Sequence, residues 1–533
     1  MKQWTKALRW ILIGCASVAG TAFAQEQPPR LFKQVQAQEP PSNPGPWLQT
    51  WQIEIDQQAI QQPAEAIILN LPGQREITVR RDFWSPRQGY MILLVGDGPE
   101  TIQLPDPNAA PDDFSWRWYG RTDGHVVALT FEKGYLAGRI WGPGGKYALN
   151  PRAGKRTELG LVNPGWWQLH PDREDLPQVE ADAVATPIAS ATTSEQPAGP
   201  GSWNTSCPDP LPTRTSVIDV LVMYTPTILS ESGSIGGLRA VMQREVDEAN
   251  QVLRNTLVST VRFNLKDTEA VPGDTAPTYE NTPLAAALAR LSGTAETPGV
   301  YPGRTYPGNP LVRARRDAHA ADVVALARRD PGTLCGVAFV QRYYNYTPPI
   351  EPGPEFERKS YMVFDPNCSG DRLNLAHELG HLLGMEHDPR NAGMPGNAFP
   401  SCPWSFGHRY ATTAEPRFAF RTVMSYWGNG GGSSQGPSCS TDEACPLIDA
   451  FSNPALEWAG IRPPGASPSD PYGILPVGTY PGSPSPAKPI GRNINEPPTT
   501  YGPSRAYDTL ARIAPIVEAF RARHDGIFAN GFQ

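Results

Sequence analysis

The residues most able to do chemistry lie at 377–388, HELGHLLGMEHD, where three histidines and three acidic residues fall close together. On a helix, residues four apart project from the same face, so His377 and His381 can aim an imidazole nitrogen at one point. Gly384 lets the chain turn out of the helix and return His387 as a third ligand. Because a catalytic zinc site needs three protein ligands and an open position for water, the spacing predicts one catalytic Zn²⁺ ion.

Glu378 follows the first of these histidines, where its carboxylate can reach a water on the metal without binding the metal itself. Zinc lowers the pKa of such a water to near 7, and Glu378 can take its proton and pass it to a departing amine. This predicts an enzyme, a zinc-dependent hydrolase of peptide bonds. The alternative is a zinc-stabilised binding or adhesion protein that has lost activity, but such a protein has no use for this base. A structural Ca²⁺ ion is left open.

The same twelve residues resemble the extended HExxHxxGxxHD signature of the metzincin zinc endopeptidases, and TVMSY at 422–426 resembles their Met-turn. The resemblance covers 215–460. It implies an α/β (α+β) zincin-like catalytic domain with two lobes around a zinc cleft, in which an extended peptide binds as an added strand. Met424 would pack below the metal without binding it.

Two further residues resemble those of two different metzincin groups. Asp388 is similar to the acid of the adamalysin or reprolysin group, where it is structural; the alternative is a solvated acid at the helix end. Tyr426 is similar to the tyrosine of astacins and serralysins, which implies a movable fifth zinc ligand that stabilises the oxyanion; the alternative is a tyrosine that packs the turn. The mixture resembles a secreted bacterial-type reprolysin-like peptidase near the peptidyl-Asp metallopeptidases. The branch and the cleavage preference stay open.

The elements that must position these residues follow from hydrophobic periodicity. Apolar runs predict strands, and apolar residues at helical spacing predict amphipathic helices. The helix with the histidines is expected to begin near Asp371, to end at Gly384 and to lie beneath the sheet of an α/β layer. The other expected elements are strands at 218–224, 261–265, 336–340 and 361–364, and helices at 238–253 and 311–329.

The N-terminal half predicts export and latency. Residues 1–24 read as a signal peptide, with Lys2, Lys6 and Arg9 before an apolar run too short to span a bilayer. A β-rich, propeptide-like domain is expected at 25–171, and an exposed linker with a processing site at 172–214. We therefore expect a zymogen that is secreted to the extracellular or periplasmic space. The alternative for 25–171 is a stable accessory or carbohydrate-binding domain.

The remaining features set the partners. The net charge of −7 gives no indication of a basic patch for nucleic acid. We expect the substrates to be proteins or peptides and the protein to be a monomer that does not contact a membrane. A Pro/Gly-rich segment is expected at 461–503, followed at 504–533 by a helix packed on the catalytic domain and a tail. Cys207 is expected to form a disulfide, and the alternative is a thiolate that blocks the zinc. Packing or surface roles are expected for the other histidines, His125, His170, His319, His408 and His524.

Overall fold

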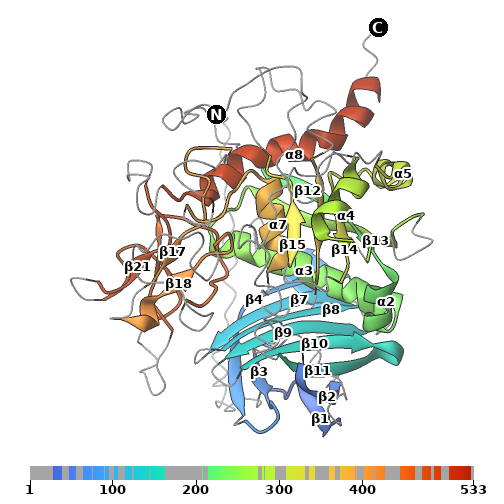
Figure 1. Cartoon of the computed structure of the whole chain (residues 1–533). Coiled ribbons are helices and arrows are strands. Elements are labelled where there is room, and N and C mark those ends of the chain that lie inside the picture. Colours follow the sequence, from blue (N-terminus) through green and yellow to red (C-terminus); the bar gives the residue numbers. More distant parts are fainter. Residues whose placement is uncertain are drawn as a thin grey trace, which may run out of the picture.

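The computed structural model describes a little over half of the chain (Figure 1). The described residues are 28–38, 47–55, 64–74, 76–88, 90–94, 101–105, 114–122, 125–142, 145–162, 207, 214–273, 279–280, 282–293, 308–329, 335–341, 359–366, 373–389, 392, 401–411, 415–425, 445–461, 471–481, 485–493 and 503–529. The expected signal peptide, most of the expected linker and Tyr426 lie outside them. Among the described helices, none is both long and apolar enough to cross a bilayer.

A nine-stranded antiparallel sheet, which we call the N-terminal sheet, occupies the first part of the chain (Figure 1). The two edge strands of this sheet are β1 and β3. Backbone hydrogen bonds join Ile68 of β3 to residues 29–31, which directly precede β1. The sheet therefore curls until its edges meet, which removes open edges. Its strands are β1 Phe32–Ala37, β2 Trp47–Ile55, β3 Ala66–Leu69, β4 Ile77–Gln88, β7 Ser115–Thr122, β8 His125–Glu132, β9 Tyr135–Gly142, β10 Gly145–Arg152 and β11 Arg156–Val162; β5 Tyr90–Leu94 and β6 Thr101–Pro105 form a separate pair.

A five-stranded sheet, the central sheet, follows with the order β13-β12-β14-β16-β15. Four strands are parallel, whereas the short edge strand β15 is antiparallel to β16. The strands β12, β14 and β16 are largely or fully buried, and β13 is partly exposed. Parallel strands covered on both faces read as continuous apolar runs, and such runs predict β12 and β16 from the sequence. The strands are β12 Ser216–Tyr224, β13 Val261–Ala270, β14 Val323–Ala327, β15 Gly336–Ala338 and β16 Tyr361–Phe364.

Helices cover the central sheet. Helix α3 (Ile235–Asn255) lies between the two sheets, while α7 (Asn374–Leu382) packs against α3, β15 and β16. The C-terminal helix α8 (Ala506–Ala529) contacts β12 and β13, and its Leu510, Ile513 and Val517 are buried in the same core (Figure 1). The other described helices are α2 Pro226–Ser232, α4 Leu284–Ser292, α5 Pro310–Ala318 and the 3₁₀ turns η2 Ala153–Lys155 and η5 Pro416–Phe418.

Short strands complete the C-terminal region. The described pairs are β17 (Arg409–Tyr410) with β18 (Phe420–Arg421), and β19 (Leu456–Trp458) with both β20 (Ile474–Pro476) and β21 (Lys488–Pro489).

The structure corrects two expected elements. The segment 311–329 is not one helix, because α5 ends at Ala318, the chain turns through Ala320 at φ 49°, and the rest forms the buried strand β14. Five consecutive apolar residues mimic a helical face when they follow a real helix, so periodicity alone merges the two elements. The helix with the histidines begins at Asn374 with Leu373 at its N-cap position, a few residues later than expected, and Asp371 lies outside the described residues.

Candidate metal centre

Helix α7 delivers two histidines and one glutamate from a fully buried segment. The helix ends at Leu382, and Gly384 then adopts φ 84°, the left-handed conformation that the sequence predicts for it. A side chain at Gly384 would also collide with Ser401, since an added Cβ would lie 2.6 Å from the Ser401 Cβ. The sharp turn brings His387 back beside His377 and His381.

The three histidines converge through their Nε2 atoms. The Nε2 atom of His387 lies 3.3 Å from that of His377 and 3.1 Å from that of His381. The other ring nitrogens are held by carbonyl oxygens, because His377 Nδ1 lies 2.7 Å from the Val423 oxygen and His381 Nδ1 lies 2.8 Å from the Met385 oxygen. An Nδ1–H that donates to a carbonyl leaves a lone pair on Nε2.

This donor set fits a metal ion. Nitrogen lone pairs that face one another repel unless a cation lies between them, and ligands at about 2.0–2.1 Å on a tetrahedral ion stand roughly 3.3 Å apart. Burial, together with the neighbouring histidines, holds the pKa of His381 and of His387 well below the ordinary value. Both rings are therefore neutral, as metal ligands must be. These three residues could hold a metal ion.

Glu378 lies beside this group and is 1% exposed. With His377 it lines a small cavity of about 10 Å³, which is about the room that one water molecule requires. The other lining residues are Cys335, Leu373, Asn374, Val423 and Leu447. A carboxylate, an imidazole and space for a single water are thus brought together in a buried site.

The segment beneath the site packs against α7. Met424 is fully buried, and its sulfur lies 2.5 Å from where a Cβ at Gly380 would stand, so glycine makes room for it. The neighbouring Val423 supplies the carbonyl that holds His377.

Asp388 is not a solvated acid. It is 2% exposed, and its Oδ1 lies 3.3 Å from Nε of Arg409 on β17. The ion pair joins the end of the histidine segment to the short β17–β18 pair, which supports the structural interpretation. Sequence reasoning gave no role to Arg409, because nothing in its local pattern indicates a partner in another segment.

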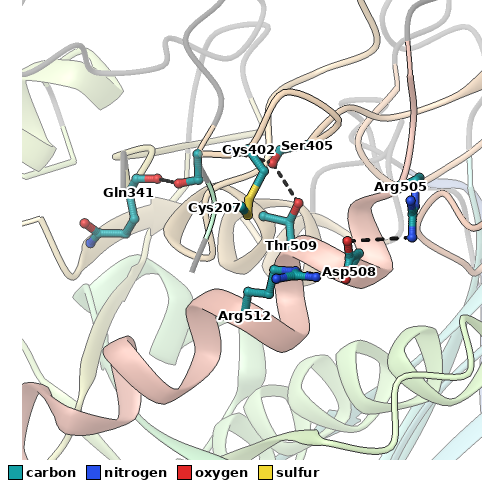
Figure 2. The surroundings of a disulfide bond; sticks show 9 residues. Cys207, Gln341, Cys402, Ser405, Arg505, Asp508, Thr509 and Arg512 are labelled. Carbon is teal, nitrogen blue, oxygen red and sulfur yellow. Dashed lines mark hydrogen bonds and ion pairs between the residues drawn. A yellow bond between two sulfur atoms is a disulfide. The ribbon is translucent and has the colours of Figure 1, made fainter. Parts of the chain in front are cut away.

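Cys207 is bonded to Cys402, as expected, so the alternative of a Cys207 thiolate on the metal is wrong in this structure (Figure 2). Figure 2 shows the disulfide beside Ser405, whose hydroxyl lies 2.7 Å from that of Thr509 on α8. Cys335 and Cys445 are also disulfide-bonded. The remaining two cysteines of the expected exported chain, Cys368 and Cys439, lie outside the described residues.

A second group, Asp267, Glu269 and His319, is partly exposed and is already neutralised by arginines. Arg239 pairs with Asp267 at 3.1 Å, and Arg315 pairs with Glu269. Positive side chains thus stand where a cation would, and the packing or surface role expected for His319 fits this network. His125 and His408 are buried, whereas nothing is described of the side chains of His170 and His524.

Comparison with known proteins finds a family match over part of the chain. Residues 214–443 match the family model Reprolysin_5, described as Metallo-peptidase family M12. The match and the mixed α/β content support a zincin-like fold and a zinc metallopeptidase, a hydrolase that acts on proteins or peptides. No curated protein matches the chain.

Two solved structures have low similarity to the chain. One, entitled "Structure of a chaperone-substrate complex", has 14% identity and a TM-score of 0.32, and the match covers 58% of this chain and 36% of that one. The other is metalloproteinase-II from Bacteroides fragilis, with 12% identity and a TM-score of 0.30, and the match covers 63% of this chain and 85% of that one.

Proposed function

We propose that the protein is a secreted zinc-dependent endopeptidase, made as a zymogen, with His377, His381 and His387 as zinc ligands and Glu378 as the general base. The observation that carries this proposal is the convergence of the three Nε2 atoms beside a buried carboxylate. Zinc, when bound, supplies a Lewis acid that polarises a peptide carbonyl and makes a water more acidic.

The chain's own residues supply the positioning and the proton transfer. The Val423 and Met385 carbonyls fix the tautomer and the orientation of two ligands. Glu378 accepts the proton of the attacking water and donates it to the amine that leaves. Burial strengthens this carboxylate's interactions, because little solvent competes with them.

The edge of the central sheet is the proposed site for the substrate backbone. Among the described strands, β15 pairs with β16 on one side and has no strand neighbour on the other. A peptide extended along this edge can add a strand through main-chain hydrogen bonds. Because α7 contacts β15, such a peptide would run past Glu378. We further propose that Tyr426, which directly follows the described segment 415–425, stabilises the oxyanion.

The proposed prosegment is the N-terminal sheet, which covers one face of α3 through β8, β9 and β10. The proposed zymogen is converted by cleavage in the linker expected at 172–214. Export is proposed from the N-terminal signal pattern.

The first prediction concerns Glu378. Glu378→Gln keeps the shape of the side chain but removes the base, so we expect cleavage of casein or a peptide library by the exported protein to fall by about 10²–10⁴-fold. Zinc content, measured by atomic absorption, is expected to stay unchanged. Glu415→Gln, in a partly exposed ion pair with Lys488, is the control and should keep full activity. A Glu378→Gln protein as fast as wild type, or cleavage that resists a zinc chelator, would contradict the proposal.

A further inference from the structure

Gly336 opens the edge strand β15, and its backbone does not need a glycine. Its φ is not positive, unlike that of Gly384, so any L-residue could adopt this conformation without strain. The strand pairing is also ordinary, since Gly336 stands opposite Phe364 in a regular antiparallel register. The reason for a glycine here must therefore be space.

The space is filled by the carboxylate of Glu378. A Cβ added at Gly336 would lie 2.7 Å from Cδ and 2.8 Å from Cγ of Glu378, and closer still to Oε1. Non-bonded carbon atoms rest at about 3.5–4.0 Å. The proposed base thus occupies the volume in which a side chain of residue 336 would otherwise stand.

The strand is held more firmly than the side chain. The carbonyl of Cys335 accepts a 2.8 Å hydrogen bond from the Asp365 N–H, and Cys335 is disulfide-bonded. On the far side, the partner strand β16 is fully buried in the core of the central sheet. Because the atoms nearest to the added methyl group belong to the end of a rotatable side chain, Glu378 would move before β15 does.

We propose that Gly336 is a positioning residue, which sets the place of the Glu378 carboxylate by leaving the volume beside it open. The inference rests on the proposed function of Glu378. A displaced carboxylate would miss the hydrogen-bond distance that proton transfer requires, although the fold and the three histidines would stay in place.

The second prediction is that Gly336→Ala lowers kcat with little change in KM. A misplacement of about 1 Å can cost on the order of 100-fold in rate, and we expect a loss of that size in peptide cleavage by the exported protein, with wild-type zinc content. The matched control is Gly160→Ala on β11, whose added methyl group would also meet a side chain, 2.8 Å from Cδ2 of Trp47, but within the N-terminal sheet and away from the histidines. It should keep the kcat and KM of the wild type.

A second measurement tests the contact without activity. Melting temperatures are compared in the presence of chelator for wild type, Gly336→Ala, Glu378→Ala and the double variant. We expect Gly336→Ala to lower the melting temperature in the presence of Glu378, and to lower it less, or not at all, once that side chain is shortened to alanine. Residues in contact show such coupling, whereas independent sites add.

The outcomes separate the two proposals. If wild type cleaves with chelator sensitivity but Gly336→Ala is equally active, or if its effects on melting simply add to those of Glu378→Ala, the positioning role of Gly336 is wrong and the proposed function stands. If wild type shows no chelator-sensitive cleavage, the proposed function fails and the positioning role fails with it. If Gly336→Ala raises KM and leaves kcat unchanged, the residue acts on substrate binding instead, which also overturns the inference.

Discussion

A buried histidine outside the metal site shows what burial alone does to this side chain. His408 is 4% exposed, its ring faces Phe420, and its backbone N–H donates to the Thr422 hydroxyl. Burial, with a smaller contribution from the positive charge of Arg492, lowers the pKa of His408 to about 3. The imidazole ring of His408 is therefore neutral in the folded protein at neutral pH.

The third prediction follows from this pKa. The pKa of His408 in the folded protein is below the ordinary 6.5. The contribution of the neutral ring to the free energy of unfolding is therefore fully present above pH 6.5. It is lost as the pH falls toward 3, because the unfolded chain then binds a proton that the folded protein does not. At about 1.4 kcal/mol for each pKa unit, the loss is on the order of a few kcal/mol. His408→Gln, which does not titrate there, should flatten the decline of the unfolding free energy between pH 6.5 and 4. Urea unfolding with chelator present, which removes metal release from the comparison, measures it; parallel curves for the two proteins would contradict it.

At the scale of elements, α3 is a helix with two different buried faces. Its apolar face, with Leu238 and Val252, packs into the core of the central sheet. Its charged face lies under the N-terminal sheet, where Arg139 of β9 pairs with Glu245 at 2.7 Å and also with Glu248. Burial lowers the pKa of Arg139, but the two carboxylates beside it raise this pKa overall. Burial raises the pKa of Glu248. The charged face ties the two sheets together.

The fourth prediction is that Arg139→Met destabilises the protein strongly. The substitution leaves Glu245 and Glu248 buried beside it without this cation, and breaking such a pair costs about 3–5 kcal/mol. Arg30→Met, which breaks an exposed pair with Glu76, should cost at most about 1 kcal/mol. Urea unfolding at neutral pH compares them. Equal losses would mean that the buried cluster contributes no more than a surface pair.

The predictable part of the structure is the part with local causes. The i, i+4 spacing of His377 and His381 and the turn at Gly384 depend on neighbours in sequence, so their convergence could be predicted. The partners that hold the site come from distant segments, as when Val423 holds a histidine ring and Gly336 accommodates the base. No local pattern encodes these contacts.

The same limit applies to whole elements. The sequence predicts the amphipathic helix at 238–253, because its apolar period is unbroken along α3. Periodicity does not separate the strand β14 from the helix before it, because the apolar run of β14 closely follows α5. That the charged face of α3 would lie buried under another sheet could not be predicted either, since a charged stripe usually faces water.

At the scale of the whole molecule, the segments before and after Cys207 are attached to the catalytic part in different ways. From Cys207 onward, the chain is held covalently by Cys402, and Arg214 and the Val217 N–H both bind Glu518 of α8. Upstream, the N-terminal sheet is held on α3 by side-chain contacts such as those of Arg139 and Thr130. We therefore infer that a cut on the N-terminal side of Cys207 leaves two parts joined without a covalent bond.

The fifth prediction concerns this division. Processing in the linker expected at 172–214 should fall before Cys207, so the larger fragment of the exported protein should begin between 172 and 207 by N-terminal sequencing. Both fragments should separate on denaturing gels with or without reductant, yet elute together under native conditions, because charged pairs still join the N-terminal sheet to α3.

Arg139→Met is expected to release the N-terminal fragment from the cut protein and to raise peptide cleavage, whereas Arg30→Met is the control that should do neither. An active exported protein that still begins at Gln25 would contradict processing, and fragments that separate only with reductant would contradict the noncovalent attachment, because they would place a disulfide between the two parts.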